Sequence, residues 1–134
     1  MMEDFLIINA KEFIKARPSG EIDLEQSKKI LIELACLAKP PADYDILIDV
    51  REVYGNLTLT DMCELVFELC KHRQAFSNKI ALLVRDDIQA LNASMLELYA
   101  KDRGFITKVF TDFEETVEWL QDSVDSERDP TSNS

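Results

Sequence analysis

Glycine and histidine are scarce in this chain, which has 134 residues but only three glycines and one histidine. Gly20, Gly55 and Gly104 lie too far apart to form a dinucleotide-binding loop or a phosphate-binding P-loop, because both motifs need several glycines close together. The single histidine, His72, excludes a metal site built from several histidines. It falls in Lys71-His72-Arg73, at the end of a predicted helix, where the helix dipole favours a cation. We therefore interpret His72 as structural.

The sequence also lacks a long apolar run, a basic leader and paired cysteines. No segment approaches the roughly 20 apolar residues of a membrane-spanning helix. The N-terminus, Met1-Met2-Glu3-Asp4, does not have the basic start of a secretory signal. The three cysteines are odd in number and fall in helical patterns, which predicts reduced thiols. We expect a cytoplasmic protein without a membrane span.

Positive charge is in short supply, because 15 Lys and Arg residues stand against 26 Asp and Glu residues. The formal net charge is -11. Nucleic-acid binding depends on neutralising phosphates with Lys and Arg, so this balance disfavours nucleic acid and anionic lipid as partners. The basic spots at Lys28-Lys29 and Lys71-His72-Arg73 are too short to form a binding groove. A basic protein partner, or simply solubility, explains the charge better.

Strand and helix patterns alternate along the chain. The clearest strand is Ile46–Val50, an apolar run flanked by helical patterns, as in a sheet covered by helices. Phe5–Ile8 and Phe13–Ile14 predict an N-terminal hairpin, and Lys79–Val84 and Phe105–Phe110 predict two more strands. We predict an α/β fold with a single mixed, mostly parallel sheet of about five strands, an N-terminal edge hairpin and four helices.

Helices are predicted from apolar residues at helical spacing and from capping residues. Asp23 caps the first helix and Lys39-Pro40-Pro41 ends it. Asp86 or Asp87 caps the third, and Thr111–Glu114 is a capping box for the fourth. The inward faces are predicted to be Ile30, Leu31, Leu34 and Leu37, then Met62, Leu65, Val66, Leu69 and Cys70, then Leu91, Met95, Leu98 and Tyr99, and last Phe113, Val117 and Leu120 with Trp119 beside them.

The last part of the chain differs from the rest in composition. Residues 123–134 are Ser, Asp, Glu, Pro, Asn, Arg and Thr with one aliphatic residue, Val124. Such a segment cannot bury enough apolar surface to offset its ordering entropy. We predict one domain over residues 1–122 and a disordered acidic tail over residues 123–134.

Acidic residues at strand ends are the candidates for metal chemistry. Asp49, Asp86 and Asp87 lie at the carboxyl ends of neighbouring predicted strands, where ligands bind in open α/β sheets. Clustered carboxylates there could hold Mg²⁺ and make a metal-dependent enzyme that uses Asp49 and Asp86. Helix capping also accounts for Asp86-Asp87 and is the preferred interpretation. We expect no metal, no cofactor and no catalytic residue.

The segment Thr58-Leu59-Thr60-Asp61 begins the second predicted helix. Either threonine can cap this helix. A phosphate on a hydroxyl there would be stabilised by free backbone N–H groups and by the helix dipole. Capping alone is the preferred interpretation, and regulatory phosphorylation is the alternative.

Several passages together resemble a known family. Gly20-Glu21-Ile22-Asp23, the strand Ile46–Val50 and the loop entering the second helix are similar to a STAS domain of the anti-sigma-factor-antagonist (SpoIIAA-like) type. Later passages look more like the stand-alone bacterial SpoIIAA-like proteins of undefined role, namely Lys71-His72-Arg73 with Phe76, Lys79-Ile80-Ala81, Arg103-Gly104, Val109-Phe110 and Trp119-Leu120. The resemblance covers nearly the whole chain before the tail. It implies a small regulatory, non-enzymatic module that binds a protein, or a ligand in an apolar cleft.

The resemblance also suggests a modification site. In the antagonist family a serine, usually preceded by aspartate, begins the second helix and is phosphorylated by a partner kinase. Matching the loops by length places Thr58 at that serine, with Leu57 in place of the aspartate. Thr58 is therefore the candidate phospho-acceptor, and an anti-sigma-type kinase is a candidate partner. We place the partner-binding rim at Asp49, Arg51, Tyr54, Asn56, Thr60 and Asp86.

These observations leave three functions open. A regulatory protein-interaction module, as a monomer or homodimer, ranks first. A carrier of a small apolar molecule or lipid, held between the sheet and the second and third helices, ranks second. A metal-dependent enzyme ranks last. The carrier requires a cavity of roughly 300 Å³ or more at that place.

Overall fold

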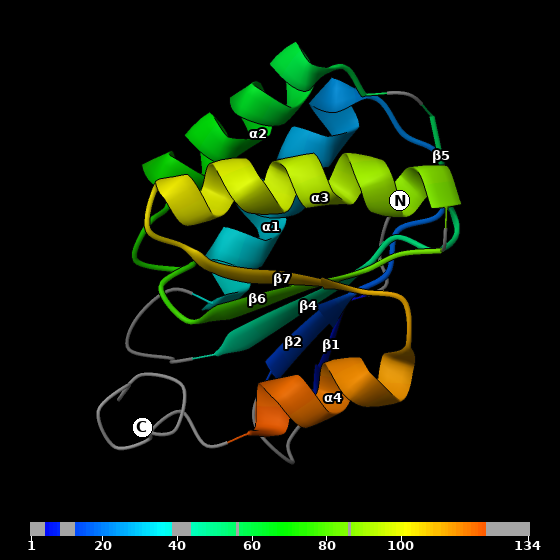
Figure 1. Cartoon of the computed structure of the whole chain (residues 1–134). Coiled ribbons are helices and arrows are strands. Elements are labelled where there is room, and N and C mark those ends of the chain that lie inside the picture. The colour runs from blue at the N-terminus through cyan, green and yellow to red at the C-terminus, as the bar shows by residue number, and fades with distance from the viewer. Residues whose placement is uncertain (1–4, 9–12, 39–43, 56, 86, 123–134) are drawn as a thin grey trace.

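The computed structural model describes residues 5–8, 13–38, 44–55, 57–85 and 87–122. Within these residues the chain forms a five-stranded sheet of order β1-β2-β4-β6-β7, a two-stranded sheet of β3 and β5, and four helices (Figure 1). The elements are β1 (Phe5–Ile8), β2 (Phe13–Ala16), β3 (Gly20–Glu21), α1 (Leu24–Ala38), β4 (Asp45–Asp49), β5 (Val53–Tyr54), α2 (Leu59–Lys71), β6 (Lys79–Leu83), α3 (Asp87–Asp102), β7 (Ile106–Phe110) and α4 (Phe113–Gln121).

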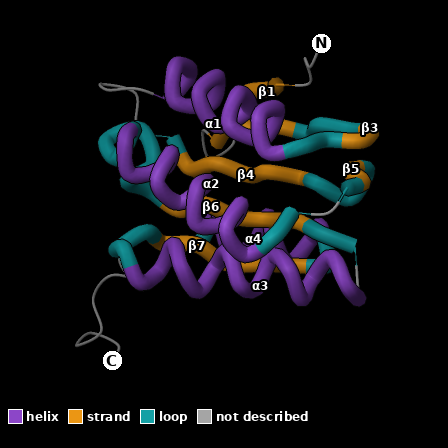
Figure 2. Tube along the Cα trace, turned by 90° about the horizontal axis from the view of Figure 1, so that it is seen from above, coloured by secondary structure: helices purple, strands orange, loops and turns teal. Residues whose placement is uncertain are grey.

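The main sheet has the predicted mixed, mostly parallel topology. β1 pairs with β2 in an antiparallel hairpin, and β2, β4, β6 and β7 pair in parallel. Helices α1, α2 and α3 lie side by side over one face of the sheet, and α4 covers the other (Figures 1 and 2). The predicted α/β fold class is therefore confirmed.

Alternation along the strands produces a core on each face of the sheet, because successive side chains of a strand point to opposite sides. The register aligns Ile14, Ile46, Ile80 and Thr107 across β2, β4, β6 and β7. The three isoleucines of this row belong to the larger core, beneath α1, α2 and α3. The smaller core, on the α4 side, consists of Phe13, Leu47, Ala81, Leu83, Phe110 and Leu120.

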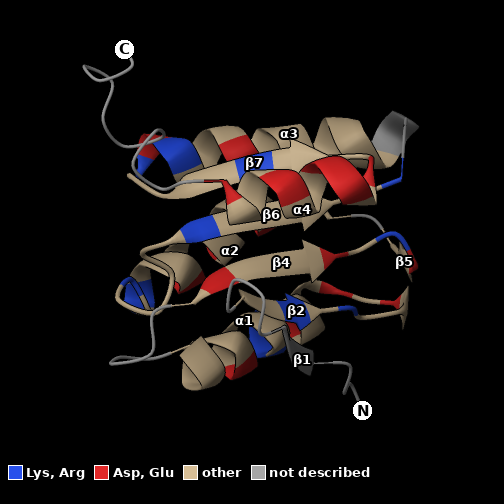
Figure 3. Ribbon diagram, turned by 90° about the horizontal axis from the view of Figure 1, so that it is seen from below, with Lys and Arg blue, Asp and Glu red and all other residues tan. Residues whose placement is uncertain are grey.

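A buried lysine holds α4 to the sheet. Lys79, at the start of β6, donates from Nζ to Trp119 O at 2.6 Å and to Asp122 O at 3.3 Å. Its ammonium also lies 5.2 Å from the centre of the Trp119 ring. The last turn of α4 is thereby tied to β6, and acidic residues are found along α4 and near strand ends on this side of the molecule (Figure 3).

Two helix starts follow from local hydrogen bonds. Asp23 caps α1 as predicted, since its Oδ1 accepts from Gln26 N at 2.9 Å. The cap of α4 is Asp112 and not Thr111, because Asp112 Oδ2 accepts from Glu115 N at 3.0 Å. The prediction that Thr111 caps this helix, with Glu114 as its partner in a capping box, was therefore wrong by one residue, and the cap is a single hydrogen bond to the Asp112 side chain. Asp86 lies outside the described residues, so its predicted capping role stays a prediction.

The predicted inward face of α3 was wrong for Leu91 and Leu98, although Tyr99 packs against the core as predicted. Leu91 and Leu98 are 68% and 58% exposed, and the packed face carries Leu96 and Ala100 instead. The reason is a contact to the edge of the sheet, where Glu97 Oε1 accepts from Val109 N on β7 at 3.1 Å. This contact fixes the rotation of α3 and turns Leu91 and Leu98 toward solvent.

Single positions on two other helices also differ from their predicted burial. Leu37 on α1 and Phe113 on α4 are 40% and 38% exposed. Smaller side chains occupy the interior in their place, Ala35 and Ala38 on α1 and Thr116 on α4. Close packing of a helix on a sheet accommodates such small residues, which a search for large apolar residues overlooks.

A small parallel sheet was not predicted. Gly20 and Glu21 pair with Val53 and Tyr54, and Ile22 N donates to Tyr54 O at 3.0 Å. Strands of two residues leave no alternating pattern in a sequence, which explains the omission. Gly55 follows at a φ of +135°, and a Cβ there would lie 2.8 Å from Ile22 O. Only glycine allows the two segments to approach so closely.

Two further predictions concern the C-terminal tail and the absence of a membrane-spanning helix. The predicted tail at residues 123–134 lies outside the described residues, so the domain boundary at residue 122 stays a prediction. Among the helices of the described ranges, none has the length and apolar character needed to cross a lipid bilayer.

Candidate functional site

An apolar cavity of about 420 Å³ lies between the sheet and the three helices α1, α2 and α3. Its floor is formed by Ile48 on β4 and by Ile80 and Leu82 on β6. Its roof comes from all three helices and is apolar for the most part, with Ile30, Leu31, Met62, Leu65, Leu69, Ala93, Leu96 and Ala100. The cavity therefore occupies the place that an apolar-ligand carrier requires.

The cavity runs along the strands and has a deep end and a mouth. Ile80, Leu82 and Val84 lie along β6 and its extension, and all three line the cavity. A strand rises about 3.3 Å per residue, so Ile80 and Val84 are roughly 13 Å apart. Exposed Tyr54 and Arg85 line the end near Val84, which is therefore the mouth at the carboxyl ends of the strands. The deep end lies near Ile80.

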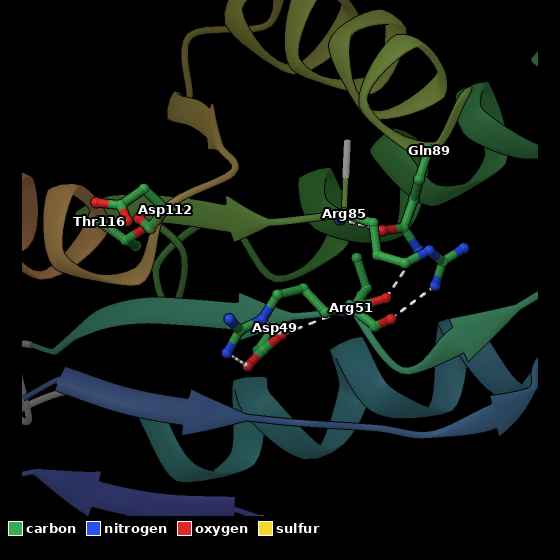
Figure 4. A network of polar contacts seen from close by, with 7 residues as sticks. Asp49, Arg51, Arg85, Gln89, Asp112 and Thr116 are labelled. Atoms are coloured by element: carbon green, nitrogen blue, oxygen red, sulfur yellow. Dashed lines mark hydrogen bonds and ion pairs between the residues drawn. The ribbon is translucent and has the colours of Figure 1, made fainter. Parts of the chain in front are cut away.

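Hydrogen bonds from Arg85 and Gln89 cross-link the mouth (Figure 4). Arg85 Nη1 donates to Arg51 O at 2.6 Å and to Val53 O at 3.0 Å, and its guanidinium lies 5.0 Å from the centre of the Tyr54 ring. Gln89 Nε2 donates to Val50 O at 2.8 Å, and Gln89 Oε1 accepts from Arg85 N at 2.6 Å. The segment after β4 is thus fixed to the connection between β6 and α3.

Asp49 and Arg51 form an ion pair beside the mouth but outside the cavity. Asp49 accepts from Arg51 N at 3.1 Å, Nε at 3.0 Å and Nη2 at 2.9 Å. The Asp49 side chain is 1% exposed and lies on the opposite face of the sheet from Ile48, which lines the cavity. Burial opposes ionisation, but the hydrogen bonds from Arg51 outweigh it and hold the pKa of Asp49 below its usual value.

This ion pair bears on the metal hypothesis. Both carboxylate oxygens of Asp49 are already bound by Arg51. Asp86, its proposed partner in a metal site, lies outside the described residues. Within the part of the chain that the structure describes, no group of three or more His, Cys, Asp or Glu side chains is arranged to hold a metal ion. The geometry on hand therefore favours a structural role for Asp49.

Thr58 is the N-cap of α2. Its Oγ1 accepts from Asp61 N at 3.0 Å, and Asp61 Oδ2 accepts from Thr58 N at 3.0 Å, which makes a reciprocal capping box. The capping prediction is confirmed. Thr58 is exposed, and its role as a phospho-acceptor stays a prediction. The C-cap of the same helix is His72, whose Nε2 lies 3.1 Å from Glu68 Oε2, in agreement with its structural interpretation.

The predicted partner-binding rim is only partly assembled. Tyr54 lies at the mouth of the cavity and Thr60 is exposed in the first turn of α2. Asp49 and Arg51 are engaged with each other, and Asn56 and Asp86 lie outside the described residues. Sequence reasoning missed Arg85, Gln89 and Thr107, which all line the cavity. The only signal for these three residues in the sequence was their polarity within or near a predicted strand. Polarity alone does not show which atoms a side chain contacts in the folded protein.

Comparison with known proteins identifies the fold. No protein-family model matches the chain, and no curated protein matches it significantly. A solved structure does match, that of an uncharacterized protein of the DUF3478 family with a SpoIIAA-like fold from Shewanella loihica PV-4. The sequences are 18% identical, the TM-score is 0.61, and the match covers 90% of this chain and 92% of that chain. Similarity at this identity concerns the fold alone, and the chain therefore has a SpoIIAA-like fold.

Proposed function

We propose that this protein is a non-enzymatic binding protein that holds one small apolar molecule in the cavity beneath α1, α2 and α3. The cavity itself is the observation that supports this function. Its volume of about 420 Å³ falls within the roughly 300–1,000 Å³ of small-molecule sites. Native interiors are close-packed and leave few voids larger than a water molecule, so packing alone does not explain a space of this size.

The lining side chains favour binding over catalysis. Among the described residues that line the cavity, none is Asp, Glu, His, Cys or Lys. The lining does contain the hydroxyls of Ser27, Tyr54 and Thr107, but a hydroxyl usually needs one of these side chains as a general base to become a nucleophile. Within the described part of the chain, Arg85 is the one charged residue that lines the cavity, and it already donates to two backbone carbonyls. The lining chemistry thus suits retention of an unreactive, uncharged molecule.

Titration with an uncharged fluorophore tests this function. N-phenylnaphthylamine is apolar and fluoresces more strongly when it leaves water, so its emission should rise and saturate at one molecule per chain. A bound ligand also stabilises the folded state by mass action, by about 2.7 kcal/mol at one hundred times the dissociation constant. The melting temperature should therefore rise with probe concentration. Emission that never saturates, with an unchanged melting temperature, would count against the proposal.

Regulated protein binding is a second candidate, because α2 and α3 present large apolar side chains to solvent. Leu59, Phe67, Leu91 and Leu98 are 55%, 58%, 68% and 58% exposed. The two helices are adjacent and their C-terminal ends lie together, since Arg73 Nη1 donates to Arg103 O at 2.9 Å. With a net charge of -11, the chain suits a partner with apolar anchors among basic residues. In this function Thr58, next to Leu59, is the proposed phospho-acceptor of an anti-sigma-type kinase.

The contribution of this face can be measured once a basic partner has been purified. The double substitution Phe67→Ser with Leu98→Ser should weaken the partner's affinity at least tenfold, because buried aromatic and aliphatic anchors carry most of the binding energy in interfaces. Leu37→Ser on α1 is the matched control, since Leu37 is likewise a large apolar residue at the surface, with 40% of its area exposed. Equal affinities for the double variant and the control would remove α2 and α3 as the docking face.

A further inference from the structure

The hydroxyl of Thr107 is buried at the deep end of the cavity without a visible partner. Thr107 is 3% exposed and lines the cavity. Among the residues that the structure describes, none forms a hydrogen bond with its Oγ1. A buried hydroxyl without a hydrogen bond is unfavourable, and most buried polar groups in native proteins have a partner. A partner is therefore missing from this site.

The position of Thr107 in the sheet makes its polarity unexpected. The other members of its row across the sheet are Ile14, Ile46 and Ile80. Valine would nearly match the shape of threonine and would suit a strand equally well. It would also avoid an unpaired hydroxyl. Packing and strand propensity thus account for a β-branched residue at this position, but not for its oxygen.

Most other polar side chains of the cavity are at or near its mouth and are already engaged. Arg85 and Gln89 donate to backbone carbonyls of the segment after β4, and Ser27 Oγ donates to Asp23 O at 2.9 Å. Asn92 lies one helical turn beyond Gln89. Between these groups and Thr107 the floor and roof are apolar. A molecule that fills the cavity therefore meets an apolar channel ending in one hydroxyl.

On the basis of the proposed function, we infer that the ligand is a neutral, elongated apolar molecule with a hydroxyl or carbonyl oxygen at its innermost end, and that Thr107 binds this oxygen. A hydroxyl both donates and accepts, so Thr107 can pair with either group. The roughly 13 Å between Ile80 and Val84 matches a medium-length aliphatic chain. An anionic head group is disfavoured at the deep end, where none of the residues described by the structure places a cation in the lining.

The test compares octanol with chlorooctane, which has the same number of heavy atoms but no hydroxyl. Their affinities are measured by displacement of N-phenylnaphthylamine from the wild-type protein, Thr107→Val and Thr107→Ser. The ratio of octanol to chlorooctane affinity should fall roughly tenfold in Thr107→Val, which is the size of one lost hydrogen bond. In Thr107→Ser, which keeps the hydroxyl, the ratio should stay close to that of the wild type.

The outcomes separate this inference from the proposed function. An unchanged ratio in Thr107→Val, with both compounds still bound, would overturn the role of Thr107 and leave the cavity as a binding site. Failure of the wild type to bind any of the three compounds would overturn the proposed function itself.

A melting curve without ligand provides a second, independent readout. Thr107→Val should melt at the same temperature as the wild type or higher, because an unpaired buried hydroxyl has been removed. A lower melting temperature would show that the hydroxyl already has a partner, such as a buried water, and would contradict the inference.

Discussion

Ala93→Phe should abolish binding of N-phenylnaphthylamine. Ala93 lines the roof of the cavity on α3 and is half-buried. A phenylalanine there places its ring in the space between α3 and the sheet, where the ligand would lie. Because the ring is apolar and enters an existing void, we expect a stability equal to that of the wild type or greater. Loss of binding without loss of stability would assign the ligand to the cavity.

Ala90→Phe is the matched control for this experiment. Ala90 is on the same helix and is also half-buried, but it does not line the cavity. The control should bind the fluorophore with the affinity of the wild type. Equal binding by Ala93→Phe and Ala90→Phe would show that the probe binds elsewhere, for example on the exposed apolar residues of α2 and α3.

Arg51→Ala should destabilise the protein by about 3 kcal/mol at neutral pH. The substitution leaves the carboxylate of Asp49 buried without its ion-pair partner, which typically costs 3–5 kcal/mol. We expect the lower end of this range because the Arg51 side chain is 38% exposed and because Lys15 is close enough to attract the Asp49 charge. Denaturant unfolding of the two proteins measures the difference.

The pH dependence of that difference identifies Asp49 as its cause. In the wild type the pKa of Asp49 is lowered on folding, so its stabilising contribution is present above the unfolded pKa, about 3.9. This contribution is lost as the pH falls through the folded pKa. In Arg51→Ala the hydrogen bonds are gone and burial raises the pKa of Asp49, so protonation relieves the penalty. The difference in stability between the two proteins should therefore begin to narrow above about pH 4, where Asp49 of the variant takes up its proton, and should narrow further below about pH 4, where the wild type loses its contribution.

A double variant controls for the loss of the Arg51 side chain itself. Asp49→Asn combined with Arg51→Ala removes the buried charge together with its partner. This double variant should be more stable at pH 7 than Arg51→Ala alone, since replacing both partners of a buried pair costs less than removing one. A difference in stability of less than 1 kcal/mol between the wild type and Arg51→Ala, or a difference that does not change with pH, would contradict a structural role for this ion pair.

The elements predicted best from the sequence are those with strong local signals. Ile46–Val50 and Lys79–Val84 are apolar runs between turn residues, and both form parallel strands inside the sheet. Their observed boundaries differ from the predicted ones by one residue at most. Asp23 and Thr58 stand directly before helical patterns, and both cap the helices that follow. These features depend on a few neighbouring residues, so a sequence contains the information needed to find them.

The orientation of α3 could not be predicted in the same way. Leu91, Met95 and Leu98 have helical spacing, which usually marks a buried face. The structure buries Ala100 and packs Leu96 against the core instead, because the hydrogen bond from Val109 N to Glu97 fixes the helix over the edge strand. That contact joins residues twelve positions apart and depends on the final position of β7. The exposed leucines were thus assigned to the core.

The candidate site was predicted in outline but not in its residues. A ligand space between the sheet and the second and third helices was expected as an alternative, and a cavity of about 420 Å³ lies there. Its lining includes small residues, such as Ala93 and Ala100 on α3, together with Leu82 and Ile80 on the sheet. Such a void depends on packing distances of a few ångström, which no sequence pattern specifies. The unpaired hydroxyl of Thr107 is likewise visible only once its surroundings are assembled.

A crystal structure with bromooctane bound would locate the ligand in the protein, because bromine can be placed by its anomalous scattering. We expect one bromine position inside the cavity, enclosed by Leu65 on α2, Leu96 on α3 and the floor residues of β6. A structure in which side chains of α2 and α3 fill this space, with bromine found only on the surface, would contradict the claim that the protein holds an apolar ligand.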